Sequence, residues 1–290
     1  MMRTAINQHS GEEYPAKREI CSGYDDDKPD EEYLYRGRMY CGHDDKILEM
    51  RSINRYKFSL NYINEGDICL DAACGTGYGS LLISQKAKRV IGLEISDHAL
   101  QYAQERYQND RIEFRKADLT RPFDLPDDYF DVIVSVETLE HISNHDAMLS
   151  EFRRVLKPGG LMIMTTVDHY IYSEKGGIKN KFHIGELTKK ELLELISRYF
   201  KPEELYGHLK YVPLPRQKRF IKKLWISFTE TLAKLDILGL RYRLLGFFHL
   251  NKRLGTFSHS LSTIVETDME KSDFHTENEY YQLLVVARKL

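Results

Sequence analysis

The sequence contains few cysteines and no long apolar run, and each absence excludes a class of protein. Only four cysteines occur among 290 residues: Cys21, Cys41, Cys69 and Cys74, with no C-x-x-C pair. Such a set is too small for a disulfide framework and suits a reducing compartment. No segment approaches the roughly 18 apolar residues that a membrane span requires, and residues 1–15 have no apolar signal core. We therefore expect a cytoplasmic protein.

The chain also lacks an excess of charge of either sign. Lys and Arg number 42 and Asp and Glu number 44, which gives a formal net charge of -2. A nearly neutral protein has no general attraction to nucleic acid, so no nucleic-acid partner is expected. A chain of 290 residues is long enough for one main domain with smaller additions.

Strand and helix patterns alternate along the middle of the chain. Short apolar runs predict strands at 67–74, 89–94, 111–118, 130–137, 161–168, 203–208 and 280–289. Helical spacing predicts one or two helices over 45–64, and further helices at 79–87, 96–108, 145–160 and 187–200. This alternation is typical of an α/β fold. We predict a doubly wound, Rossmann-like sheet of seven strands with helices on both faces.

Composition divides the chain into four parts. Residues 1–45, with the run DDDKPDEE, form an acidic segment that we expect to be partly mobile. Residues 46–207 form the core, and 279–290 supply its last strand. Between them, 208–278 are far longer than a hairpin connection needs, which predicts an insertion.

The insertion is locally basic. From residue 208 to 255 there are eleven Lys or Arg against Glu230 and Asp236, and apolar residues of 220–235 recur at helical spacing. A basic amphipathic helix over 216–235 could contact the inner face of a membrane. The same pattern also suits a lid or a dimer face, which would make the protein an oligomer.

The stretch DAACGTGYG, residues 71–79, follows the first predicted strand and indicates a cofactor loop. In a dinucleotide site, G-x-G-x-x-G places backbone amides against a pyrophosphate. Here the third glycine position is Ser80, and Asp71 would repel a pyrophosphate. S-adenosylmethionine has no phosphate and carries an ammonium and a sulfonium, which a carboxylate attracts. The residues therefore favour S-adenosylmethionine over NAD.

Together, DAACGTG, GLEIS, KADL, FDVIVSVETLEHI and LKPGG resemble the class I S-adenosylmethionine-dependent methyltransferases, of the methyltransferase type 11-like kind, between residues 62 and 200. Ala73 stands where these enzymes usually have their first glycine. The resemblance implies that Glu94 accepts from the ribose hydroxyls and that Asp118 and the Leu119 amide contact the adenine. The other implied cofactor-binding residues are Asp71, Ala73, Gly75, Thr76, Gly77, Ile95 on the adenine face and Glu137 on the methionine side.

Methyl transfer to an alkyl hydroxyl requires a group that removes the hydroxyl proton. His141 lies just past the fourth predicted strand, and sugar O-methyltransferases of this superfamily often carry a histidine there, sometimes assisted by an acid that Asp168 could match. His183, in NKFHIGEL, is the second candidate, since that loop lies over the active site in such folds. We expect no metal site.

A finer resemblance is to methyltransferases of bacterial surface-polysaccharide biosynthesis. It rests on EEYLYRG, on Asn-Arg-Tyr at 54–56 and on NKFHIGEL, where Lys181 replaces a proline. It implies O-methylation of a sugar hydroxyl on a glycan or a glycan precursor. The alternatives are a small-molecule or quinone-type methyltransferase, an NAD-binding oxidoreductase, and a non-catalytic cofactor-binding partner protein.

Overall fold

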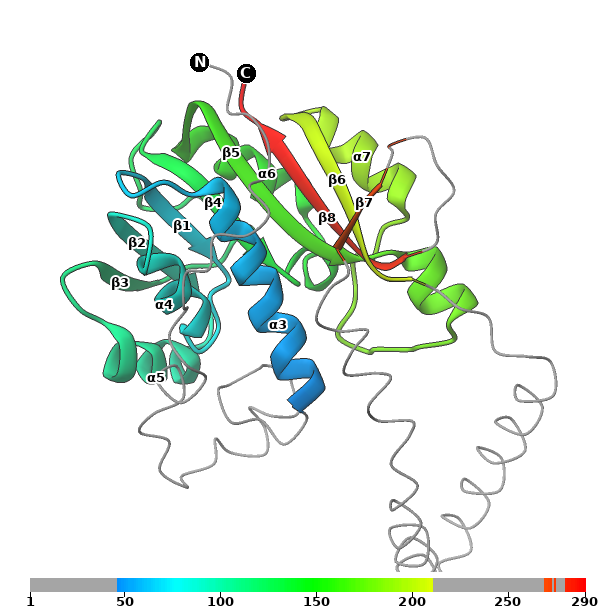
Figure 1. Cartoon of the computed structure of the whole chain (residues 1–290), viewed down its shortest axis with the longest axis horizontal. Coiled ribbons are helices and arrows are strands. Elements are labelled where there is room, and N and C mark those ends of the chain that lie inside the picture. The colour runs from blue at the N-terminus through cyan, green and yellow to red at the C-terminus, as the bar shows by residue number, and fades with distance from the viewer. Residues whose placement is uncertain (1–45, 211–268, 273, 275–279) are drawn as a thin grey trace, which may run out of the picture.

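The computed structural model describes residues 46–210, 269–272, 274 and 280–290 (Figure 1). The described strands are β1 (Ile68–Ala72), β2 (Arg89–Glu94), β3 (Ile112–Lys116), β4 (Phe130–Val136), β5 (Leu156–Val167), β6 (Lys201–Lys210), β7 (Met269–Ser272) and β8 (Tyr280–Arg288). The described α-helices are α3 (Lys46–Ser59), α4 (Tyr78–Ser84), α5 (Asp97–Tyr107), α6 (His145–Val155) and α7 (Lys189–Ser197). Short helical segments are η1 (Leu60–Tyr62), η2 (Leu139–His141) and the π-helical η3 (Tyr170–Lys175).

All eight described strands form one sheet in the order β3-β2-β1-β4-β5-β8-β6-β7. The first five are parallel, whereas β8 pairs antiparallel with both β5 and β6. The order reverses direction at β1 and β4, and ligands of open α/β sheets bind outside the carboxyl ends of the strands at such a point. The predicted α/β class is confirmed, and the site is expected beyond β1 and β4.

Apolar side chains cover both faces of the sheet. Helices α6 and α7 pack on one face, where Met148, Phe152 and Ile196 are fully buried with Ile133 and Met162. Helices α3 and α4 cover the other face, and α5 packs there over β3. Parallel strands that are buried on both faces read as continuous apolar runs, and this is why the sequence pattern located them.

Two extents differ from the sequence predictions. The sheet has eight described strands rather than seven, because β7, which pairs with β6, lies inside the range assigned to the insertion. The helix predicted over 145–160 ends at Val155, and Leu156 already has extended backbone angles, φ -79° and ψ 135°. Pro158 disfavours helical geometry at Lys157, so the segment 156–160 joins β5 instead.

Side-chain caps fix the start of two of the described helices. The Ser96 side chain accepts from the Ala99 amide at the start of α5. Thr188 and Glu191 form a reciprocal capping box at the start of α7. The acidic segment 1–45 and the amphipathic stretch 216–235 lie outside the described residues, and their roles stay predictions.

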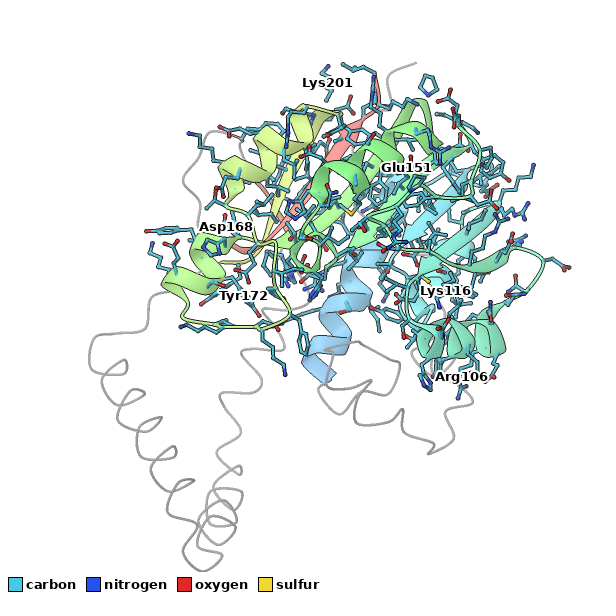
Figure 2. The ribbon with its side chains drawn as sticks, turned by 180° about the vertical axis from the view of Figure 1, so that it is seen from behind. Arg106, Lys116, Glu151, Asp168, Tyr172 and Lys201 are labelled. Carbon is cyan, nitrogen blue, oxygen red and sulfur yellow. The ribbon has the colours of Figure 1, made fainter. Side chains whose placement is uncertain are left out.

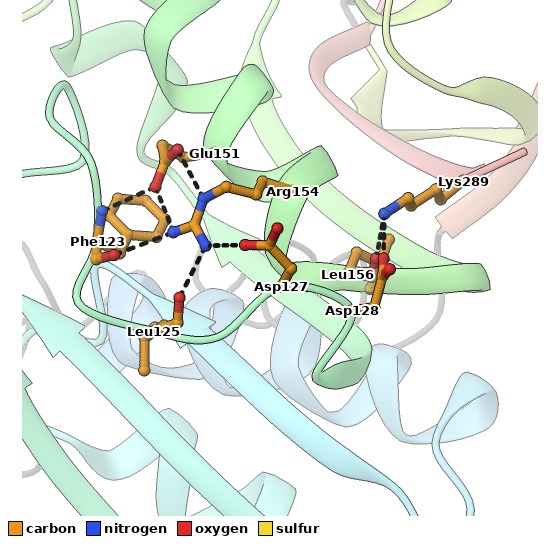
Figure 3. Close-up of polar contacts among 8 residues, drawn as sticks. All are labelled: Phe123, Leu125, Asp127, Asp128, Glu151, Arg154, Leu156 and Lys289. Carbon is orange, nitrogen blue, oxygen red and sulfur yellow. Dashed lines mark hydrogen bonds and ion pairs between the residues drawn. The ribbon is translucent and has the colours of Figure 1, made fainter.

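A single guanidinium connects α6 to the loop that precedes β4. Figure 3 shows Arg154 at the centre of this contact, with Glu151 one turn away on the same helix. Its donors reach the Asp127 carboxylate at 2.6 Å and the carbonyls of Leu125 and Phe123 at 2.8 and 3.0 Å. Such a network holds the start of β4 in place more firmly than an isolated surface ion pair would.

Among the helices that the structure describes, none has the length and apolar character needed to cross a bilayer.

Candidate functional site

A cavity of about 700 Å³ opens at the carboxyl ends of β1, β2 and β4, as the strand order predicts. Eight predicted site residues line it: Ala73, Gly75, Glu94, Ile95, Asp118, Leu119, Glu137 and His141. Five predicted residues lie outside its wall: Asp71, Thr76, Gly77, Asp168 and His183. The wall also includes residues that were not predicted as site residues, among them Ser52, Tyr56, Tyr78, Thr138, Phe182 and Ile184.

The glycine loop turns through left-handed backbone angles. Ala73, Gly75 and Gly77 have φ values of 60°, 58° and 84°. Gly77 thereby caps the start of α4, while Gly79 lies so close to α3 that a Cβ there would meet the Tyr56 ring at 2.1 Å. The glycines therefore allow the loop to turn tightly and allow α3 to pack closely against α4.

Asp71 lies behind the cavity wall. Its carboxylate is fully buried and accepts from the Tyr56 hydroxyl at 3.0 Å and from the Ser80 hydroxyl at 2.6 Å. Burial raises the pKa of Asp71 to about 7, although the two hydrogen bonds act in the opposite direction. In the structure Asp71 therefore joins α3 and α4 to the glycine loop, and its direct contact with a cofactor stays a prediction.

Glu94 and Asp118 lie at the ends of neighbouring strands on the cavity wall. One Glu94 oxygen accepts from the Gly75 amide at 3.1 Å and the other from the Ser96 amide at 2.8 Å. Asp118 accepts from the hydroxyl and the amide of Thr120 at 2.7 and 2.9 Å, and these hydrogen bonds lower its pKa. Both carboxylates are thus fixed in orientation before any ligand arrives.

Ile95 follows Glu94 and is 53% exposed at the cavity. An exposed isoleucine on the same wall as two fixed carboxylates offers an apolar face and hydrogen-bond acceptors together, which suits a ring such as adenine.

Glu137 has the left-handed φ of 50° at the end of β4. Its carboxylate accepts from the Thr165 hydroxyl at 3.1 Å and from the Gln282 amide at 3.0 Å, and Arg55 lies 3.6 Å away. Glu137 therefore links β5, β8 and α3 at the cavity floor.

His141 lies at the end of η2 and faces the cavity. Its Nδ1 is 3.0 Å from the Phe182 carbonyl oxygen. A carbonyl can only accept, so Nδ1 carries the proton and the lone pair of the neutral ring is on Nε2. His141 is thus prepared to accept a proton or to bind a cation.

His183 is buried behind His141, with its side chain 7% exposed. The two rings meet edge to face with 4.8 Å between centroids. The Nδ1 of His183 lies 2.6 Å from the Glu186 carboxylate, which Ser173 and His169 also contact. Burial alone would raise the pKa of Glu186, but the hydrogen bonds from Ser173, His169 and His183 outweigh it and lower that pKa.

Asp168 does not share the cavity wall with His141. It lies at the end of β5 beside the π-helical segment that carries Tyr172, as Figure 2 shows. Its two oxygens accept from the amides of Ile171 at 3.1 Å and Lys189 at 3.0 Å, and burial raises its pKa. Asp168 therefore joins the π-helical segment to α7. Neither of these two hydrogen bonds involves His141, so the predicted assistance of Asp168 to His141 stays a prediction.

Two wall residues that were not predicted as site residues lie one turn apart on α3. Ser52 and Tyr56 have the i, i+4 spacing that places side chains on one helix face. Their spacing was visible in the sequence, but nothing local indicated that this face would close the cavity.

The charge of the wall decides which cofactor fits. Glu94, Asp118 and Glu137 line the cavity, and its described wall contains no Lys or Arg. A pyrophosphate would meet three carboxylates and no lining Lys or Arg, whereas a sulfonium and an ammonium would be attracted. The wall therefore fits S-adenosylmethionine. The strand order and this cavity define the class I S-adenosylmethionine-dependent methyltransferase fold.

Comparison with known families gives the same class. Residues 70–164 match a family model described as a methyltransferase domain, and the chain thus carries an S-adenosylmethionine-dependent methyltransferase domain. It is 36% identical over 140 residues to a probable S-adenosylmethionine-dependent methyltransferase of Mycolicibacterium smegmatis, covering 48% of this chain and 53% of that protein. It is 34% identical over 110 residues to a demethylmenaquinone methyltransferase of Tropheryma whipplei, covering 37% and 44%. The matched region spans about half the length of these relatives.

Solved structures support the fold. A chain of the complex between the Haloferax volcanii Trm112 methyltransferase activator and its methyltransferase superposes with a TM-score of 0.54 at 17% identity, covering 90% of this chain and 99% of that one. The YcgJ protein of Bacillus subtilis gives a TM-score of 0.52 at 15% identity, covering 82% and 98%. At these identities the likeness concerns the fold alone.

Proposed function

We propose that the protein transfers the methyl group of S-adenosylmethionine to a sugar hydroxyl of a glycan or a glycan precursor in the cytoplasm. The observation that carries the proposal is His141, a histidine on the cavity wall whose Nδ1 faces the Phe182 carbonyl oxygen. Its Nε2 lone pair suits removal of the hydroxyl proton. A sugar hydroxyl needs such help because it is a weak acid.

The chain's own residues prepare the transfer by position. In this proposal Glu94 and Asp118 orient the nucleoside end of the cofactor and Glu137 contacts the methionine end; all three line the cavity. Phe182 and Ile184 cover the cavity beside His141 with apolar surface, which helps to exclude water. S-adenosylmethionine supplies the reactive sulfonium carbon, and most of the acceleration comes from holding the acceptor oxygen in line with it.

A second candidate is a quinone-type acceptor. It is favoured by the sequence relation to a demethylmenaquinone methyltransferase and by the exposed apolar rim, where Ile95 and Ile184 are 53% and 64% exposed. A phenol or enol loses its proton readily, so this candidate gives His141 no essential part.

The test is methyl transfer from S-adenosylmethionine with a labelled methyl group. Nucleotide-activated sugars and lipid-linked oligosaccharides form one acceptor set, and demethylmenaquinone forms the other. We expect a labelled sugar methyl ether, with kcat lowered about 10²–10⁴-fold in His141→Gln. Binding of S-adenosylhomocysteine, measured by calorimetry, should be unchanged in that variant. Label on demethylmenaquinone alone would overturn the glycan proposal, and binding of NAD instead of S-adenosylhomocysteine would overturn the methyltransferase proposal.

A further inference from the structure

Folding brings together two histidines and a carboxylate that are separate in the sequence. A ring nitrogen of His141, a ring nitrogen of His183 and a carboxylate oxygen of Glu140 lie within 4.8 Å of one another. Glu140 and His141 come from η2 after β4, and His183 comes from the loop after η3. No metal site was expected from the sequence, and the spacing of these three residues follows no metal-ligand pattern.

Both histidines are held in the tautomer that a metal ion requires. The Nδ1 of His183 faces the Glu186 carboxylate at 2.6 Å, and the Nδ1 of His141 faces the Phe182 carbonyl oxygen at 3.0 Å. Each Nδ1 therefore carries the proton, and each Nε2 carries the lone pair. A carboxylate or carbonyl behind the ligating imidazole is the usual arrangement at metal sites, where it fixes the ring and raises its basicity.

Glu140 completes the cluster from the buried side. It is 1% exposed, and one of its oxygens accepts from the Thr166 hydroxyl at 2.8 Å. This hydrogen bond holds the buried carboxylate beside the two histidines.

The loop that carries His183 is pressed against η2. The Gly185 amide donates to the Glu140 carbonyl at 2.9 Å, and a Cβ at Gly185 would meet the Ile142 carbonyl oxygen at 2.0 Å. The His183 ring also stacks on Tyr172, with 5.3 Å between centroids. The two histidines are therefore held together by backbone contacts and packing that do not depend on an ion.

We propose that Glu140, His141 and His183 bind one divalent transition-metal ion, with Zn²⁺ as the best-suited probe, at the acceptor side of the cavity. Two imidazoles and one carboxylate match the ligands that Zn²⁺ accepts in three-ligand sites with an open position. Mg²⁺ and Ca²⁺ prefer oxygen ligands, and two of the three ligands here are nitrogen.

The role of the ion rests on the proposed function. Bound at the open position, the acceptor hydroxyl becomes more acidic, and its proton passes to solvent as the oxygen–methyl bond forms and the sulfur–methyl bond breaks. The products are the methyl ether, S-adenosylhomocysteine and one proton, and the ion is unchanged. His141 then acts as a ligand, and the ion, in place of the His141 ring as a base, lowers the barrier to proton loss.

Metal binding is tested without any acceptor. The full chain, freed of affinity tags and treated with a chelator, is titrated with Zn²⁺ by calorimetry and with Co²⁺ by visible absorption. We expect one tight Zn²⁺ equivalent, weakened at least 10-fold in His141→Ala and in His183→Ala. Glu186→Gln should weaken Zn²⁺ binding about 10–100-fold, because it removes the charge behind His183.

His98→Ala is the matched control, since His98 is an exposed histidine of α5. It should leave Zn²⁺ affinity unchanged. Each variant is first shown to bind S-adenosylhomocysteine like the parent protein, which separates loss of a metal-binding side chain from loss of the fold. If His183→Ala does not fold, His141→Ala still decides the test, because His141 is an exposed residue. Zn²⁺ affinity that is equal in His141→Ala and the parent protein, or a site that prefers Mg²⁺, overturns the proposal. Formation of a sugar methyl ether by chelator-treated protein would leave the proposed function intact and remove the ion from it.

Discussion

At the scale of single residues, Asp71 illustrates how a carboxylate of a cofactor loop can act from behind the cavity wall. It is completely buried, yet it accepts two hydroxyl hydrogen bonds from α3 and α4. Burial raises its pKa to about 7. The ordinary pKa of an aspartate in an unfolded chain is about 3.9.

Asp71→Asn is expected to flatten the pH dependence of stability. Between about pH 4 and pH 7 the folded protein holds a proton on Asp71 that the unfolded chain releases, so the free energy of unfolding falls as pH rises. The contribution is at most about 1.4 kcal/mol per pH unit in that interval. Urea unfolding of the cofactor-free protein at pH 4.5–8 measures it. Parallel curves for the parent protein and the variant would contradict the assigned pKa.

The residues at strand ends were predictable, and those contributed by packing were not. Glu94 is the last residue of β2, Ile95 follows it, and Asp118 lies two residues past β3, so strand positions alone bring them to one edge of the sheet. Tyr56 reaches the cavity only because α3 packs over the glycine loop, where Gly79 has no side chain. His183 contacts both Glu186 and the His141 ring because the loop folds back onto η2, and no short-range sequence pattern predicts this fold of the loop.

At the scale of elements, the segment 182–186 depends on Gly185. There is no space for a Cβ between this residue and Ile142, and the same residue donates to the Glu140 carbonyl. The sequence indicated the NKFHIGEL loop by resemblance, but the reason for its glycine appears only once η2 lies beneath it. The boundary between α6 and β5 was also missed because of a contact made only in the fold. Leu156 pairs with Phe130 of β4, and this strand pairing replaces the helix that the sequence spacing predicted there.

Gly185→Ala is expected to move the loop away from η2 and separate His183 from His141. The methyl group would lie 2.0 Å from the Ile142 carbonyl oxygen, a distance that backbone atoms must relieve by shifting. We expect a loss of methyl transfer of about 10²-fold, since a displacement of about 1 Å near reacting groups costs that much. Affinity for S-adenosylhomocysteine should change little.

Gly159→Ala serves as the comparison for that experiment. Gly159 lies in β5 far along the strand from the cavity, with open space around it, so its substitution strains only its own positive φ of 76°. Equal activity of Gly185→Ala and the parent protein would contradict the role given to the loop.

At the scale of the whole molecule, β8 occupies the middle of one half of the sheet. It pairs with β5 over Leu161–Val167 and with β6 over Lys201–Lys210, and residues 283–287 are almost completely buried. By contrast, β7 pairs with β6 alone and forms the edge. The strand itself was predicted from its apolar run, but its partners were not, because residues 211–279 separate it from β6 in the sequence.

Backbone amides of β8 are expected to be among the slowest of the described residues to exchange with deuterium. A strand paired on both sides opens only with the global unfolding transition, whereas an edge strand opens locally. Peptides covering 280–288 should therefore retain protons at least 10-fold longer than those covering 269–272. Hydrogen exchange followed by mass spectrometry compares them, and equal rates would show that β8 is not an integral part of the sheet.

The position of β8 also has a consequence for how the chain reaches its fold. Leu161 and its partner Arg288 are 127 residues apart in the sequence, so their pairing closes a long loop and comes late. Until residues 280–288 have left the ribosome, β5 presents an unpaired, apolar edge that other chains could join. During synthesis, the protein is then most prone to aggregation just before β8 emerges, and a chaperone that shields β5 would act in that interval.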